Sequence, residues 1–194
     1  MSVENPKSLC ISAGNDFNFE FNIKQNKDMI NSEQIIEMVD KEFGDKFGRY
    51  YNGMIENYKC DDAEVILITT GTITGTSRIV CDEMRSEGKK VGILKLRYLR
   101  PFPTEKINNT LKNAKAVGII DKNMSFGYEG TIFTNVNSSL LKLENSPKTI
   151  NFIGGIGGKD ITKANIKEAF EVLLKVSNGD KQERIQYMNV RCDK

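Results

Sequence analysis

Apolar and polar residues alternate strictly in the segment FNFEFNI near the start of the chain, where single polar residues separate Phe17, Phe19 and Phe21. A period of two is typical of a strand, and it would place the three phenylalanines on one face. A strand with one such apolar face needs another surface that buries this face. We expect an isolated chain to expose this face and to associate through it.

The residues that follow change to helical spacing. Residues 31–43 carry apolar side chains at intervals of three and four, between a capping Asn31 or Ser32 and the terminating Gly44, a pattern that predicts a helix. We therefore expect residues 1–52 to form an N-terminal arm of one strand and one helix that packs on the domain or on a partner.

From residue 53 onward, short apolar runs alternate with amphipathic segments. Four of the runs are almost continuously apolar, as in strands whose two faces are both covered, and the segments between them repeat at helical spacing. This alternation predicts one α/β domain, residues 53–176, with a mainly parallel sheet and helices on both faces. The expected strands are residues 54–59, 65–71, 91–97, 116–121 and 149–154, and the expected helices are residues 77–87, 104–114, 132–141 and 162–174.

The last helix has the best defined start. Thr162 is a natural N-cap, and Ile161 and Ile166 occupy the staple positions on either side of it. The tail that follows, residues 177–194, is polar with scattered apolar positions. It either frays or docks on another surface.

Composition excludes several kinds of site. Lys and Arg number 28 and Asp and Glu 26, so no basic block indicates a nucleic-acid or membrane partner. The chain has no histidine, which removes Ser-His and Cys-His nucleophile pairs. Its cysteines lie far apart, which argues against zinc or a cysteine-ligated iron–sulfur cluster in this chain. With no signal-like segment we expect a cytoplasmic protein, and we predict no catalytic, cofactor-binding or metal-binding residue. The four cysteines are Cys10, Cys60, Cys81 and Cys192.

Glycine-rich loops follow two of the expected parallel strands, at the ends where such sheets usually bind ligands. The loop GGIGGKD, residues 154–160, departs from the phosphate loop GxxxxGK followed by Ser or Thr, because Gly154 and Gly158 enclose three residues and Asp160 replaces the hydroxyl. The loop GTITGT, residues 71–76, is not GxGxxG, although its hydroxyls and amides could face an anion. We interpret both as turns and helix caps, with phosphate binding as the alternative.

Two other loops carry arginines and aromatic residues. RYLRPFP places Arg97 and Arg100 at the end of a strand, and the prolines on either side of Phe102 stiffen the exit. DKNMSFGYEG places Phe126 and Tyr128 among glycines. Such side chains on stiff loops suit docking against a partner chain or a coenzyme phosphate, and solvated arginines are the alternative.

Taken in order, four segments resemble one family. ENYKCDDAEVILITTGTITGT, GKKVGILKLRYLRPFP, AKAVGIIDKNMSFGYEG and INFIGGIGGKDIT are similar to the C-terminal domain of the α subunit of 2-oxoacid:ferredoxin oxidoreductases, most of all the pyruvate enzymes. The likeness extends upstream through VENPKSLCISAG and EFGDKFGRYYNGMIENY. It implies a three-layer α/β/α, transketolase C-terminal-like fold with a five-stranded mixed sheet, in which residues 54–59 run antiparallel to the other strands.

The resemblance also implies an activity for the parent enzyme. Enzymes of this family convert a 2-oxoacid and coenzyme A to an acyl-CoA, CO₂ and reduced ferredoxin, using thiamine diphosphate, magnesium and iron–sulfur clusters. The sequence contains neither the metal and diphosphate motif nor the cysteine run that would hold these groups. The implied role is a non-catalytic, structural and subunit-assembly domain. Its partners would be the thiamine-binding domain and the other subunits, with ferredoxin met only through the complex.

Two alternatives stay open. One is a stand-alone module that binds coenzyme A or a nucleotide phosphate through its glycine-rich loops, and the other is a domain of a different thiamine enzyme, such as a transketolase. Lys159 stands where the family often has arginine, which would weaken a bidentate contact with a carboxylate or phosphate. The expected partner interface, which self-association could also use, comprises Phe17, Phe19, Phe21, Arg97, Arg100, Phe102, Phe126, Tyr128 and Lys159.

Overall fold

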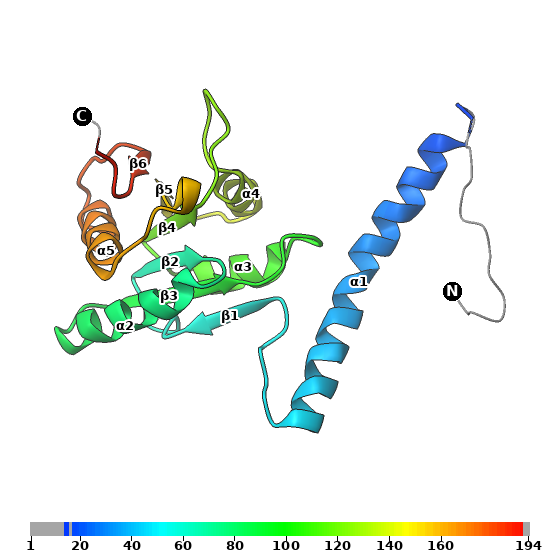
Figure 1. Cartoon of the computed structure of the whole chain (residues 1–194), viewed down its shortest axis with the longest axis horizontal. Coiled ribbons are helices and arrows are strands. Elements are labelled where there is room, and N and C mark those ends of the chain that lie inside the picture. Colours follow the sequence, from blue (N-terminus) through cyan, green and yellow to red (C-terminus); the bar gives the residue numbers. More distant parts are fainter. Residues whose placement is uncertain (1–13, 16, 192–194) are drawn as a thin grey trace.

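The computed structural model describes residues 14–15 and 17–191, so the upstream segment at residues 3–13, together with Cys10 and Cys192, lies outside the described residues. Its centre is one six-stranded sheet with the strand order β1-β3-β2-β4-β5-β6 (Figure 1). The strands are β1 (Ile55–Tyr58), β2 (Val65–Thr69), β3 (Val91–Leu96), β4 (Ala116–Asp121), β5 (Lys148–Ile153) and β6 (Ile185–Tyr187). The helices are α1 (Asn18–Phe47), α2 (Ile73–Ser86), α3 (Thr104–Leu111), α4 (Thr131–Leu140) and α5 (Lys163–Ser177), with a short 3₁₀ turn η1 (Ile156–Gly158).

The four central strands run parallel because helical crossovers connect them and both faces of the sheet are covered. Every residue of β2 and β4 is buried. The outermost strand β1 pairs antiparallel with its neighbour β3, with Ile55 opposite Leu96 and Tyr58 opposite Ile93. The predicted α/β class and the antiparallel first strand are both confirmed.

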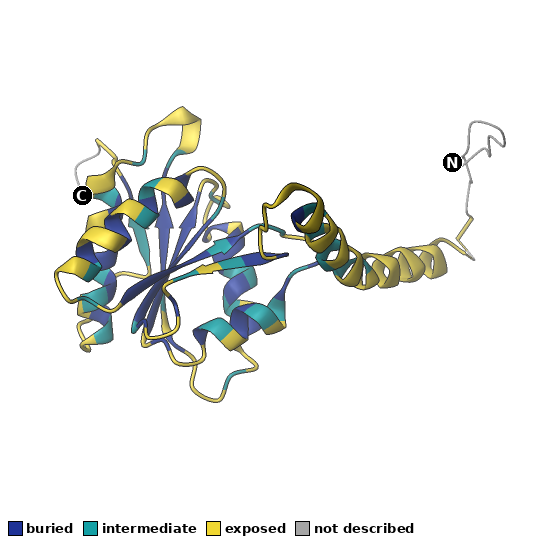
Figure 2. Ribbon diagram, turned by 90° about the horizontal axis from the view of Figure 1, so that it is seen from below, coloured by how far each residue is buried: buried dark blue, intermediate teal, exposed yellow. Residues whose placement is uncertain are grey.

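Helices cover both faces of the sheet, so that it forms the middle of three layers (Figure 2). Helices α2 and α5 share one buried cluster with the sheet, around Phe170. Helices α3 and α4 share the other cluster, around Phe133. Both phenylalanines are fully buried, and burying an aromatic side chain is among the largest single contributions that a core of this size receives.

The start of α5 confirms the predicted N-cap. The Thr162 hydroxyl accepts a hydrogen bond from the Asn165 amide at 3.3 Å, and the Asn165 side chain accepts one from the Thr162 amide at 3.0 Å. This reciprocal capping box satisfies two amides that the helix itself leaves unpaired, here with asparagine in the position that usually holds Glu or Gln.

The prediction of a strand at residues 17–23 is wrong. This segment begins α1, a helix of 30 residues that also contains the helix expected at residues 31–43. A lone strand would leave its backbone groups unpaired, whereas a helix pairs them internally, and a few alternating residues are too weak a signal to prevent this. In the helix Phe17 and Phe21 share a face, while Phe19 points to roughly the opposite side, so the three do not form one surface.

The sheet has six strands where five were expected. The polar tail docks rather than fraying, because β6 pairs parallel with β5, with Ile185 opposite Asn151 and Tyr187 opposite Ile153. A three-residue strand is too short to produce a periodic signal in the sequence. Helix α2 also begins earlier than expected, at Ile73, so most of GTITGT is helix rather than loop. Within the described part of the chain no helix is long and apolar enough to cross a bilayer.

The packing of the sheet against α5 gives a testable prediction at Gly118 in the middle of β4. A Cβ atom there would lie 2.6 Å from Leu173 Cδ1 and 2.8 Å from Phe152 Cε2. We expect Gly118→Ala to lower the free energy of unfolding by about 1–3 kcal/mol through overpacking. Urea unfolding followed by circular dichroism measures it.

Gly75 in α2 provides the matched control, because a Cβ atom there would meet nothing within 4 Å. Gly75→Ala should be neutral or should raise the free energy of unfolding by up to about 1 kcal/mol, since alanine loses less backbone entropy in a helix. Equal effects of the two substitutions would contradict the packing described for β4.

Candidate functional site

The parallel strands bring four loops to one edge of the sheet. These loops follow β2, β3, β4 and β5, and we call the edge that they form the loop rim: residues 70–72, 97–103, 122–130 and 154–162. In parallel sheets this is the edge where ligands and partners usually lie. Six of the predicted interface residues are on the loop rim: Arg97, Arg100, Phe102, Phe126, Tyr128 and Lys159.

A buried carboxylate anchors the base of the 122–130 loop. Asp121, fully buried at the end of β4, accepts hydrogen bonds from the amides of Ile132 at 2.9 Å and Phe133 at 3.1 Å, which belong to the first turn of α4. The Asn151 side chain donates to the same carboxylate at 2.9 Å and accepts from the Gly130 amide at 2.8 Å. Burial raises the pKa of Asp121, and these hydrogen bonds oppose that rise. The network therefore ties two strands to the start of α4.

The C-terminal tail secures the same loop from outside. Arg184 forms an ion pair with the buried Glu129 at 2.8 Å, and its guanidinium lies over the Phe133 ring, 5.0 Å from the centroid. The Thr134 hydroxyl donates to the other Glu129 oxygen at 3.2 Å. Glu129 and Asp121, which are the carboxylates of this loop, are thus both engaged in structural contacts.

The tip of this anchored loop is open to solvent. Phe126 is 94 % exposed and Tyr128 is 62 % exposed, while the Tyr128 amide closes a turn by donating to Ser125 O at 2.8 Å. Aromatic side chains at such exposure are typical of binding surfaces, because burying them on a partner removes a large apolar area from water. Their predicted role at a partner interface stays a prediction.

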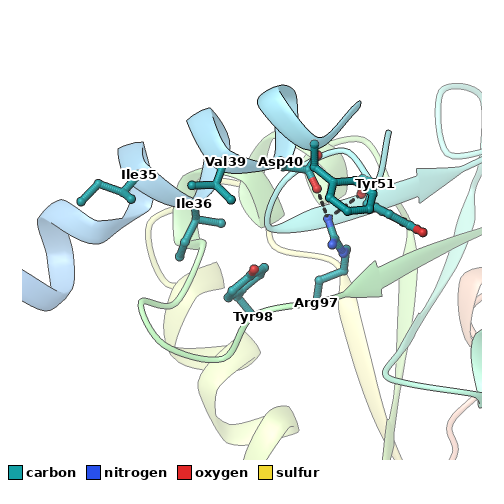
Figure 3. A pocket seen from close by; sticks show the side chains of 8 residues that line it. Ile35, Ile36, Val39, Asp40, Tyr51, Arg97 and Tyr98 are labelled. Carbon is teal, nitrogen blue, oxygen red and sulfur yellow. Dashed lines mark hydrogen bonds and ion pairs between the residues drawn. The ribbon is translucent and has the colours of Figure 1, made fainter. Parts of the chain in front are cut away.

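The 97–103 loop contacts the N-terminal arm, because the side chain of Arg97 lies against residues of the arm and of the turn that follows it. Arg97 Nη1 donates to Tyr51 O at 2.8 Å and to Asp40 Oδ1 at 3.1 Å (Figure 3). It also donates to the Gly53 carbonyl. Asp40 belongs to α1, and its other oxygen accepts from the Gly53 amide at 2.9 Å. We call this set of contacts the arm clamp, because it fixes the C-terminal half of α1 against the end of β3.

The electrostatics of the arm clamp favour a charged carboxylate. Burial by itself would raise the pKa of Asp40, but the Gly53 amide and the charged, hydrogen-bonded Arg97 guanidinium together hold it below its usual value. Gly53 has a positive φ of 65°, and a Cβ atom there would overlap the Glu37 carboxylate. Both the positive φ and the close approach of Glu37 therefore favour glycine at position 53.

The remaining predicted rim residues are placed differently from one another. Phe102 is half buried and packs against the α3 and α4 cluster. Arg100 is exposed and makes a long contact of 3.4 Å with the Asn135 side chain. Lys159 is exposed next to η1, where Gly155, Gly157 and Gly158 have positive φ. This confirms the interpretation of GGIGGKD as a turn that requires several left-handed glycines.

The two glycine-rich loops do meet. A hollow of about 280 Å³ lies between them, and its polar edge includes Thr72, Thr76, Lys122 and Lys159 together with Asp160. The backbone of the second loop is held by the tail, since Asn189 Nδ2 donates to Asp160 O at 2.9 Å.

Metal-binding chemistry does not fit the residues that the structure describes. Within residues 14–15 and 17–191 no group of three or more His, Cys, Asp or Glu side chains could hold a metal ion. The two cysteines in this part, Cys60 and Cys81, are buried. Burial raises the pKa of the Cys60 thiol to about 11, and a protonated thiol is a poor ligand and a poor nucleophile.

Comparison with known proteins agrees with this architecture. The family model described as pyruvate:ferredoxin oxidoreductase core domain II matches residues 63–166, the part of the chain from β2 to the first turn of α5. The chain belongs to this family.

Relatives of this core domain II are subunits of larger enzymes. The chain is 41 % identical over 168 residues to the pyruvate synthase subunit PorA of Methanothermobacter thermautotrophicus, covering 87 % of the chain and 43 % of the relative. It is 35 % identical over 181 residues to the ketoisovalerate oxidoreductase subunit VorA of Pyrococcus horikoshii, covering 93 % of the chain and 46 % of the relative. The chain thus spans less than half the length of these relatives.

A solved structure shares the fold of this core domain II. It is the 2-oxoglutarate:ferredoxin oxidoreductase from Magnetococcus marinus with 2-oxoglutarate, coenzyme A and succinyl-CoA bound. The match has a TM-score of 0.51 at 20 % identity and covers 64 % of this chain and 20 % of the other. At this identity the likeness concerns the fold alone.

Reasoning from the sequence missed the residues that anchor the loops. Asp40 belongs to the arm clamp, Asn151 to the Asp121 network and Arg184 to the ion pair with Glu129, and none of the three was predicted. One signal was available: Asn151 is a polar residue inside the apolar run TINFIG, and a buried polar residue requires partners. The partners of Asp40 and Arg184 lie far away in the sequence.

The Asp121 network gives a second prediction. Asp121→Ala should lower the free energy of unfolding by about 1–3 kcal/mol, because it leaves two buried amides without an acceptor and removes the shorter of the two hydrogen bonds that Asn151 Nδ2 donates. Asp160→Ala, which removes an exposed carboxylate from the neighbouring loop, should change it by less than about 0.5 kcal/mol. Chemical denaturation measures both, and similar losses would contradict the network.

The arm clamp gives a third prediction, which depends on pH. Since the folded pKa of Asp40 is lowered, its contribution is present above the unfolded value of about 4 and is lost as the pH falls through the folded pKa. We expect the protection factors of the amides in residues 37–54, which correct for the intrinsic pH dependence of exchange, to fall selectively in acid, and Asp40→Asn to show the lower protection already at pH 7. Hydrogen exchange by mass spectrometry measures it, with Glu42→Gln on the exposed side of α1 as the control. Identical protection in the wild type and in Asp40→Asn would contradict it.

Proposed function

We propose that this chain is a structural and subunit-assembly domain of a thiamine-diphosphate-dependent 2-oxoacid:ferredoxin oxidoreductase, with pyruvate as the substrate of the parent enzyme. That enzyme would convert the 2-oxoacid and coenzyme A to an acyl-CoA, CO₂ and reduced ferredoxin. Membership of the family supports the parent activity, and so do relatives whose names are pyruvate synthase and ketoisovalerate oxidoreductase subunits. The thiamine-binding polypeptide and the other subunits would be the partners.

One observation carries the assembly role. The 122–130 loop is fixed at its base by Asp121 and Asn151 and at its side by Arg184, yet it ends in the exposed Phe126 and Tyr128. An interface benefits from this combination, because a loop that is already ordered loses little entropy when it binds. A catalytic role would instead need a nucleophile, base or metal ligand, and the two carboxylates of the loop are bound in structural contacts.

The cofactors of the proposed reaction would then be held outside this chain. Thiamine diphosphate with magnesium, and the iron–sulfur clusters, need ligand sets that the described residues do not form. Ferredoxin would be met through the assembled complex. This chain would keep the thiamine-binding polypeptide and the other subunits in position.

Binding to the thiamine-binding polypeptide gives the fourth prediction. Arg100→Ala combined with Phe126→Ala should raise the Kd of that complex at least about tenfold, because an exposed arginine and an aromatic side chain are frequent hot spots of interfaces. Co-purification followed by biolayer interferometry measures it.

The control combines Lys112→Ala with Leu141→Ala, which removes one cation and one exposed apolar side chain at the opposite edge of the sheet. We expect this pair to leave the Kd unchanged. An unchanged Kd in the loop-rim variant, or an equal loss in the control, would contradict the assembly role. Calorimetry of the isolated chain with coenzyme A and ATP tests the stand-alone module, which requires micromolar binding.

A further inference from the structure

The projecting half of α1 carries apolar side chains that no described residue covers. Residues 17–31 are all exposed, and in Figure 2 this part of the helix extends away from the sheet. Phe17 is 64 % and Phe21 48 % exposed, and nearer the domain Ile35 is 57 % and Val39 52 % exposed. Grouped apolar exposure of this kind marks an interaction surface.

These four residues share one face of the helix. With 3.6 residues in each turn, residues 18 apart point in the same direction after about five turns. Phe17 and Ile35 have this separation, and so do Phe21 and Val39. The four form a stripe about 33 Å long, which we call the α1 stripe. Its two apolar ends are separated by polar residues that include Lys24 and Asp28.

A groove adjoins the C-terminal end of the α1 stripe. It has a volume of about 330 Å³ and lies between α1 and the start of the 97–103 loop (Figure 3). Ile35, Ile36 and Val39 form its helical side, and Tyr98 lies across from them. The groove is thus an apolar depression beside the α1 stripe, with room for a side chain from another molecule.

We propose that the α1 stripe pairs antiparallel with the α1 stripe of a second copy of this chain. Antiparallel pairing centred on Asp28 sets Phe17 opposite Val39 of the second copy and Phe21 opposite Ile35 of the second copy. The same contacts recur on the other side of the two-fold axis, as an isologous interface requires. Phe17 of the second copy then lies beside Val39, at the mouth of the groove.

The charges in the middle of the α1 stripe suit the same arrangement. The two Asp28 carboxylates come together near the axis, and each lies about one turn from Lys24 of the other copy. Two cations and two anions therefore meet, and the like-charged pair at the axis is flanked by lysines. Parallel pairing would instead set Phe17 and Phe21 against themselves and leave each Ile35 far from a phenylalanine.

The two halves of α1 differ in their contacts with the domain. The C-terminal half is held by the arm clamp and by an ion pair of Glu37 with Lys106 at 3.2 Å, whereas the N-terminal half projects free of the domain (Figure 1). Antiparallel pairing sets the free half of each helix along the docked half of the other. The α1 stripe is also separate from the tip of the 122–130 loop. The dimer proposal therefore goes beyond the assembly role and does not rest on it.

Oligomeric state tests the proposal, as the fifth prediction. Light scattering on the purified full chain across a dilution series should give twice the chain mass, and Phe21→Asp should raise the dimer dissociation constant at least about tenfold. The control is Phe19→Asp, which makes the same change on the opposite side of α1 and should leave the dimer intact. Thermal melting checks that both variants are folded.

Disulfide cross-linking tests the centre of the pairing. Asp28→Cys, made in a chain that carries Cys10→Ser and Cys192→Ser, should give a linked dimer on mild oxidation, because residue 28 meets its own copy at the axis. Lys27→Cys, turned by about 100° around the helix, should link far less. A monomeric wild-type chain, a dimer that survives Phe21→Asp, or a dimer broken only by Phe19→Asp would each overturn the proposal. So would a chain whose α1 stripe binds only the thiamine-binding polypeptide.

Discussion

Parallel pairing of β2, β3, β4 and β5 is the constraint on which the rest of the structure depends. It sends the carboxyl ends of four strands to one edge, and every loop that follows them must leave the sheet there. Parallel strands cannot be joined by short hairpin turns, so these loops are not held by such turns. Polar side chains hold these loops in place instead: the buried Asp121 and Asn151, at the end of β4 and in β5, and the half-buried Arg97 just past the end of β3.

These anchors divide the exposed chemistry into two surfaces. The loop rim exposes aromatic side chains on a loop that is anchored at its base. Such a surface suits a partner that binds without large conformational change. The N-terminal half of the arm projects beyond the arm clamp, in which the Arg97 guanidinium donates to two carbonyls and a carboxylate. An ion pair of Glu37 with Lys106 also holds α1 on the domain. Among the described residues, neither surface holds a group of His, Cys, Asp or Glu side chains that could bind a metal ion. The proposed role in association rests on these two exposed surfaces and agrees with relatives that are named as subunits.

The sequence predicted the central domain well, because burial dominates there. Continuous apolar runs such as VILITTG and AVGIID identify strands covered on both faces, and the Thr162 cap located α5 to the residue. The arm was predicted less well. The alternation in FNFEFNI predicted a strand, but this segment is the start of the same helix that contains residues 31–43. The same change of element turned Phe19 away from Phe17 and Phe21. Contacts between distant residues, such as Asp40 with Arg97 and Glu129 with Arg184, leave no local pattern, so the anchors of the site were missed.

Hydrogen exchange of the full chain, measured alone and in complex with the thiamine-binding polypeptide, tests the assembly role most directly. We expect slower exchange on binding at residues 97–103 and 122–130, with no change at residues 87–90 and 142–147 at the opposite edge of the sheet. Protection confined to that opposite edge, or a complex that forms with no protection of the loop rim, would contradict it.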